Sequence, residues 1–133
     1  MPALAIRLIA WNYENDVGRT QFPSWDDIEN TIRTLAERSG RIDIHDDSED
    51  GLIIMVEGSP GFYALDVMKN DDNATMLVHR NSSTDATVTV WGEEYRKDQV
   101  VFDLQLVIDI VKHLIDHNEY LETDEFVWND RAI

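Results

Sequence analysis

Between Arg41 and Trp91 the sequence alternates apolar and polar residues with a period of two, and this pattern constrains the fold more than any other feature. Alternation of this kind, in runs rich in Val, Ile, Phe, Tyr and Thr, predicts half-buried β-strands. The five runs are 41–45, 52–57, 62–68, 75–80 and 86–91. Turn-forming residues separate them, as in DDSEDG and KNDDNA. Strands so close in sequence usually pair as antiparallel neighbours, so we expect a β-meander.

Two helices and two further strands flank the predicted meander. The first helix should begin after Ser24, its N-cap, and end at Gly40, and the second should span 103–117 with Asp103 as its N-cap. The apolar stripe of the first helix consists of Trp25, Ile28, Ile32 and Leu35. Residues 3–11 and 125–128 are predicted to be strands. The expected fold class is α+β, a mainly antiparallel β-meander sheet with two helices packed on one face, in a single domain spanning residues 1–133.

The charge of the chain limits its partners. It holds 27 Asp and Glu against 11 Lys and Arg, a formal net charge of -16. Such a field disfavours direct binding to nucleic acid or an anionic membrane and attracts basic proteins. The sequence has no cysteine, which excludes disulfides and thiolate metal sites and suits a reducing cytoplasm. No apolar run approaches the ~20 residues of a membrane span. We therefore expect a soluble, cytoplasmic protein.

The segment DDSEDGLIIMVE, residues 46–57, has the ligand spacing of an EF-hand calcium loop. An EF-hand also needs a helix on each side of the loop. Here Gly40 ends the first helix, the residues before Asp46 alternate like a strand, and Gly58 and Pro60 follow. The sequence therefore predicts a β-hairpin with an acidic tip, on which a cation would settle only weakly.

The segment HLIDH, residues 113–117, resembles an inverted zinc-protease motif, although Asp116 stands where that motif has Glu. Both histidines are expected on or beside the polar arc of the second helix, with His113 paired to Asp109 and Lys112 to Asp116. A zinc enzyme also needs a third protein ligand and an open coordination position. GSPG, residues 58–61, joins two strands and is therefore a turn rather than a phosphate loop. We predict no catalytic residue, no metal and no cofactor.

The turns of a meander alternate between the two ends of the sheet, which predicts where a partner would bind. The connections 46–50, 69–74 and 92–102 should gather at one end, with nine acidic residues against three basic ones. Trp91 and Tyr95 would lie at the edge of this cluster as aromatic anchors, although Trp91 packed under the following loop is an equal alternative. The predicted partner-binding residues are Asp46, Asp47, Glu49, Asp50, Asp71, Asp72, Trp91, Glu93, Glu94 and Tyr95.

Four segments carry a resemblance to a known family through their order and spacing. They are Pro23–Asp27 at the start of the first helix, Gly58–Gly61 between central strands, Leu104–Ile115 as a late helix and Phe126–Trp128 as a closing strand. In this order they resemble the small α+β immunity proteins of bacterial polymorphic toxin systems, in particular the family often encoded beside nucleic-acid deaminase toxins. Family members commonly carry Gly and Pro before the final tryptophan, where this chain has NEYLETDE. The resemblance implies a protein that binds a toxin and occludes its active site, with no catalytic residues.

We therefore expect an immunity protein that binds and neutralises a cognate bacterial toxin, a basic protein that acts on nucleic acid. Two alternatives stay open. An acidic adaptor or nucleic-acid-mimic regulatory domain would bind another basic protein. A metal-dependent hydrolase would use His113 and His117.

Overall fold

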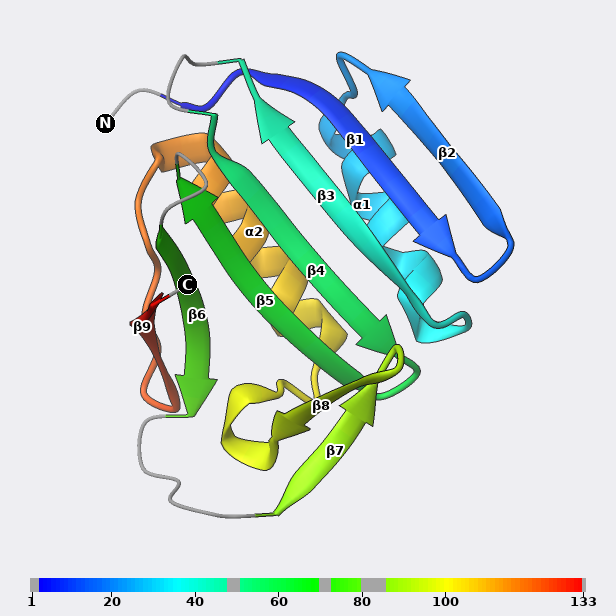
Figure 1. Ribbon diagram of the computed structural model, residues 1–133. Coiled ribbons are helices and arrows are strands. Elements are labelled where there is room, and N and C mark those ends of the chain that lie inside the picture. The colour runs from blue at the N-terminus through cyan, green and yellow to red at the C-terminus, as the bar shows by residue number, and fades with distance from the viewer. Residues whose placement is uncertain (1–2, 48–50, 70–72, 80–85, 133) are drawn as a thin grey trace.

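The computed structural model describes residues 3–47, 51–69, 73–79 and 86–132. An antiparallel sheet of seven strands, in the order β2-β1-β3-β4-β5-β6-β9, has both helices on one face, and a separate β-hairpin, β7-β8, completes the α+β fold (Figure 1). The strands are β1 Ile6–Tyr13, β2 Asp16–Gln21, β3 Gly40–Asp46, β4 Ile53–Ser59, β5 Phe62–Lys69, β6 Asn73–His79, β7 Thr87–Val90, β8 Glu93–Arg96 and β9 Phe126–Ala132. The helices are α1 Trp25–Arg33 and α2 Leu104–His117, and the 3-10 turns are η1 Thr34–Ala36 and η2 Lys97–Gln99. In the described part of the chain no helix is long and apolar enough to cross a membrane.

The main core lies between the sheet and the two helices. Alternate residues of the central strands are fully buried there, as the period of two predicts. They include Ile42, Ile44, Ile54 and Val56, which pack with Ile28, Ile32, Val107 and Ile110 of the helices. The intervening polar residues, such as Arg41 and Asp43, therefore face the opposite side of the sheet.

The predicted caps of both helices are present. Ser24 and Asp27 form a reciprocal capping box at the start of α1, and Asp103 accepts hydrogen bonds from the backbone N–H groups of Gln105 and Leu106. Helix α1 ends at Arg33, earlier than predicted, and η1 follows it. The chain has to leave the helix before Gly40, because Gly40 already begins β3.

The expected five-strand meander is wrong at its last strand. It ends at β6, because β9 pairs with β6 over seven residue positions and so occupies the edge that β7 was expected to take. Strand β7 pairs with β8 instead. A second, smaller core joins this hairpin to the sheet on the side away from the helices, and consists of Ala64, Met76, Val78, Val90, Tyr95 and Val100.

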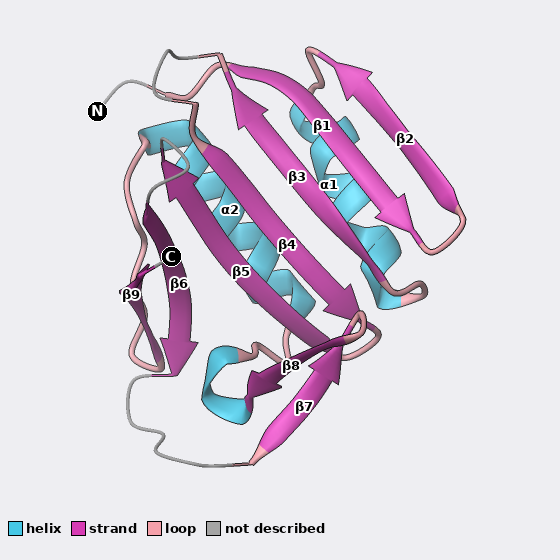
Figure 2. Cartoon of the chain, in the orientation of Figure 1, coloured by secondary structure: helices cyan, strands magenta, loops and turns pink. Residues whose placement is uncertain are grey.

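The sheet splits between β5 and β6. Their ladder joins only Asp66–Lys69 to Asn73–Met76, and β6 then curves away from β5 (Figure 2). The chain after η2 fills part of this gap, since Tyr63 exchanges two backbone hydrogen bonds with Val101, at 2.9 and 2.7 Å. The backbone of β5 is satisfied in this way, and a space is left between Val101 and the end of β6.

Candidate functional site

The structure does not gather the predicted partner-binding residues at one end of the sheet. The backbone N–H of Asp46 donates to the carbonyl oxygen of Leu52, just before β4, whereas the backbone N–H of Trp91 donates to Ser59 Oγ, at 3.1 Å, where β4 ends. Asp46 and Asp47 are therefore separated by the length of β4 from Trp91, Glu93, Glu94 and Tyr95. The expectation failed because the 92–102 connection belongs to the β7-β8 hairpin rather than to a meander. Four predicted residues, Glu49, Asp50, Asp71 and Asp72, lie outside the described part of the chain.

Asp46 has a structural role. Its side chain is 5% exposed in relative terms, and its Oδ1 accepts a hydrogen bond from the Leu52 backbone N–H at 3.1 Å. The predicted β-hairpin at this position is confirmed, because β3 and β4 flank the acidic segment and leave no helices for an EF-hand. No group of three metal-ligating side chains occurs within the described residues.

Tyr95 lies in the smaller core, and its hydroxyl group joins two acidic side chains. The hydroxyl oxygen is 2.8 Å from Glu57 Oε2 and 2.8 Å from Glu93 Oε2. Burial raises the pKa of Glu57 from 4.5 to about 7; the hydrogen bond from Tyr95 lowers it, and the negative charge of Glu93 raises it. Tyr95 thus fixes the hairpin to β4 and is not a surface anchor. Sequence reasoning considered Glu57 only as the last position of the calcium-loop spacing and missed its contact with Tyr95, which is 38 positions away.

Trp91 borders a groove of about 650 Å³ on the open face of the sheet. We call it the Trp91 groove; it is lined by Ala10, Trp11, Asn12, Val17, Gly18, Arg19, Arg41, Asp43 and Trp91. Arg41 Nε donates to Asp43 Oδ1 at 2.9 Å. Arg19 is the other basic residue of the described lining. The Arg41–Asp43 pair is nearly neutral and Arg19 adds a positive charge, so the described lining of the groove lacks the excess of carboxylates that would suit a basic partner.

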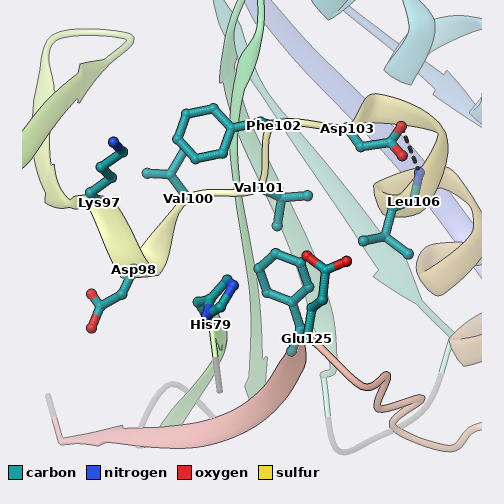
Figure 3. Close-up of a pocket in the computed structure, with 10 residues that line it drawn as sticks. His79, Lys97, Asp98, Val100, Val101, Phe102, Asp103, Leu106 and Glu125 are labelled. Atoms are coloured by element: carbon teal, nitrogen blue, oxygen red, sulfur yellow. Dashed lines mark hydrogen bonds between the residues drawn. The ribbon is translucent and has the colours of Figure 1, made fainter. Parts of the chain in front are cut away.

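A second hollow, of about 530 Å³, lies where the sheet splits (Figure 3). We call it the split-sheet hollow; it is lined by His79, Lys97, Asp98, Val100, Val101, Phe102, Asp103, Leu106, Glu125 and Phe126. Its size is within the range of ligand-binding pockets. Half of its residues are aliphatic or aromatic, and three carboxylates stand against one lysine. It therefore combines apolar walls with net negative charge.

Two exposed phenylalanines adjoin the split-sheet hollow. The rings of Phe62 and Phe102 meet edge to face with centroids 5.6 Å apart, and the residues are 37% and 50% exposed. Phe102 also lines the hollow. Sequence reasoning missed this pair, because the two residues are 40 positions apart and are brought together by the Tyr63–Val101 bridge.

The histidines of HLIDH do not form a metal site with a third ligand in the described residues. Their ring centroids are 4.6 Å apart, and His113 Nε2 lies 3.3 Å from Glu119 Oε1. The predicted His113–Asp109 pair is wrong: Asp109 accepts from Gln105 instead. The predicted Lys112–Asp116 pair is present, at 2.8 Å.

The fold and its surfaces define a small, acidic α+β domain with two hollows on a split antiparallel sheet. The chain belongs to a family of unknown function, DUF6911, whose model matches residues 6–122. Its fold is similar to that of a hypothetical protein from Neisseria gonorrhoeae known from a crystal structure, with a TM-score of 0.63 and 13% sequence identity over 90% of this chain and 92% of that chain. At this identity the likeness concerns the fold alone. A search of curated proteins finds no match.

Proposed function

We propose that this protein is an immunity protein that binds and neutralises a cognate bacterial toxin, a basic protein that acts on nucleic acid, by covering its active site. The observation that carries the proposal is the net charge of -16. Such a charge repels nucleic acid and speeds the approach of a basic protein. The resemblance of the ordered segments to immunity proteins supports the toxin as the partner.

The structure adds that several of the basic side chains are already paired with carboxylates. Five basic side chains of the described residues, Arg33, Arg38, Arg41, Arg96 and Lys112, each lie within 3.2 Å of a carboxylate. Each such pair is nearly neutral from a distance, so these cations form no basic patch of their own. The carboxylates in excess of the basic residues set the field that a partner meets.

The proposal is tested with the protein encoded next to this chain's gene. Expression of that neighbour alone should stop bacterial growth, and co-expression of this chain should restore it. The two proteins should co-elute, and the association rate should fall about tenfold or more between about 50 mM and about 500 mM salt. Growth arrest that this chain does not relieve, with no complex formed, would contradict the immunity function. A complex with a basic neighbour that is not toxic would favour the acidic adaptor.

A further inference from the structure

The split-sheet hollow has the shape and chemistry of a receptor for a long cationic side chain. Val100, Val101 and Leu106 form apolar walls, while Asp103 and Glu125 are exposed carboxylates on the same side of the hollow (Figure 3). A lysine or arginine side chain has the matching division, with an apolar stem and a charged end. An uncharged apolar group would leave the carboxylates unused, and an anion would be repelled by them.

The three carboxylates of the hollow differ in whether they already accept hydrogen bonds from the protein. Asp98 is 9% exposed and accepts from Arg96 Nε at 3.2 Å, and Asp103 caps α2 through its Oδ1. Glu125 is exposed, and within the described residues its side chain has no hydrogen bond or ion pair. Glu125 is therefore the carboxylate best able to pair with an incoming cation. Among the described residues that line the hollow, Lys97, on the opposite side, would compete with an incoming cation (Figure 3).

The exposed Phe62–Phe102 pair gives the hollow an aromatic edge. Aromatic side chains, Phe among them, are enriched in protein interfaces, and an aromatic face also attracts a cation. The Trp91 groove also has aromatic side chains, Trp11 and Trp91, but the one carboxylate of its described lining, Asp43, is already paired with Arg41, and Arg19 would repel a cation.

We infer that the split-sheet hollow receives a lysine or arginine side chain of the toxin. The identity of the partner as a toxin rests on the proposed function. Glu125 pairs with its charge, and Phe102 packs on its stem. The walls that carry this site are held by the Tyr63–Val101 bridge and by the α2 N-cap, so the site exists before the partner arrives.

Two matched pairs of variants test this inference. Glu125→Gln and Glu37→Gln each remove one exposed negative charge, so they change the overall field equally, but only Glu125 lines the hollow. Phe102→Ala and Phe22→Ala each remove one exposed phenylalanine, of which Phe22 is 71% exposed on the loop after β2. Circular dichroism and thermal unfolding establish that each variant is folded.

The first measurement uses a hexa-arginine peptide as a probe, which requires no toxin. Its addition to ¹⁵N-labelled protein should shift the amide signals of residues 97–106 and 125–126 most, and Glu125→Gln with Phe102→Ala should weaken its binding about tenfold. The double control Glu37→Gln with Phe22→Ala should weaken it less than twofold. Shifts spread evenly over the acidic surface, or equal losses in both double variants, would overturn the inference.

The second measurement uses the toxin complex and separates the two proposals. If the proposed function and the inference both hold, the hollow variants raise the Kd for the toxin about tenfold or more and the controls leave it unchanged. A toxin complex that the hollow variants do not weaken overturns the inference and leaves the immunity function standing. A peptide that maps to the hollow, with no neutralisation of the toxin, overturns the immunity function alone.

Discussion

At the scale of single residues, the two contacts of Tyr95 with Glu57 and Glu93 need a proton on one of the carboxyl groups in addition to the phenol proton. A phenol hydroxyl has one proton and donates it to one carboxylate. The other 2.8 Å contact is a hydrogen bond only when that carboxyl group is itself protonated and donates to the phenol oxygen. The raised pKa of Glu57, about 7, agrees with this geometry, because it keeps Glu57 protonated in weak acid.

This raised pKa predicts that stability falls as the pH rises. Unfolded Glu57 titrates near 4.5 and folded Glu57 near 7, so between these values the folded state binds more protons than the unfolded state. The contribution of this proton to the free energy of unfolding is fully present below about pH 4.5 and is lost as the pH rises through about 7. We expect the Tm of the wild type to fall between about pH 5 and about pH 8 by more than the Tm of Glu57→Gln, which has no proton to lose.

The comparison of the two Tm curves removes the contributions of other groups. Arg41 and Asp43 on β3, Glu93 on β8 and the histidines are present in both proteins, so the difference curve reports Glu57. Arg41 opposes the effect, since its positive charge lowers the pKa of Glu57. A difference curve that is flat from pH 5 to pH 8, or that slopes the other way, contradicts the protonation of folded Glu57.

At the scale of elements, the sequence predicts those whose signal is local. Helix α2 has its bounds and its cap as predicted, because Asp103 and the helical period of the apolar residues both lie within the segment. The sequence does not predict strand β2, DVGRTQ, because this segment has one large apolar residue and no alternation. Its stability comes from pairing with β1. Strand β8, EEYR, was missed for a similar reason.

Pairings between distant elements carry no such local signal. Strand β9 lies beside β6 although about 50 residues separate them, and this pairing displaces β7 and opens the split-sheet hollow. The net negative charge of the chain was therefore predictable from the sequence, whereas the hollow was not: none of the predicted partner-binding residues that the structure describes lines it. The positions of the expected partner-binding residues were derived from a five-strand meander, which the chain does not complete.

The close approach of β1 and β3 at Gly40 can be tested by a substitution. A Cβ atom at Gly40 would lie 2.5 Å from the Asn12 carbonyl oxygen and 2.8 Å from Tyr13 Cδ1. Because the first of these atoms belongs to a paired strand, the backbone cannot easily move away. We expect Gly40→Ala to lower the free energy of unfolding by about 1–3 kcal/mol, as overpacking of a filled site does.

Urea denaturation of Gly40→Ala beside Glu37→Ala measures this loss. Glu37 is exposed in the turn before Gly40, so its replacement should change stability by less than about 0.5 kcal/mol. A Gly40→Ala protein as stable as the wild type would mean that β1 and β3 are further apart at this position than the structure has them.

At the scale of the whole molecule, the charge that attracts a partner also destabilises the free protein. A net charge of -16 brings like charges together on folding, and salt screens their repulsion. The proposed function therefore has a measurable cost, which is a lower stability of the free protein. A bound basic partner would reduce this repulsion, and in the absence of a partner salt would reduce it. Stability of the free chain should consequently increase with ionic strength.

This gives a prediction that separates general screening from a calcium site at residues 46–57. We expect the Tm to rise by several degrees as NaCl is increased from about 10 mM to about 500 mM, because the Debye length shrinks from about 30 Å to a few ångströms. At equal concentration, Ca²⁺ should raise the Tm no more than Mg²⁺ does, since Asp46 Oδ1 is already engaged by the Leu52 backbone N–H. A specific site would instead show saturable stabilisation by Ca²⁺ at concentrations near its Kd. Saturation by Ca²⁺ alone would contradict the assignment of this segment as an acidic turn, and a Tm that does not respond to NaCl would contradict the role given to the net charge.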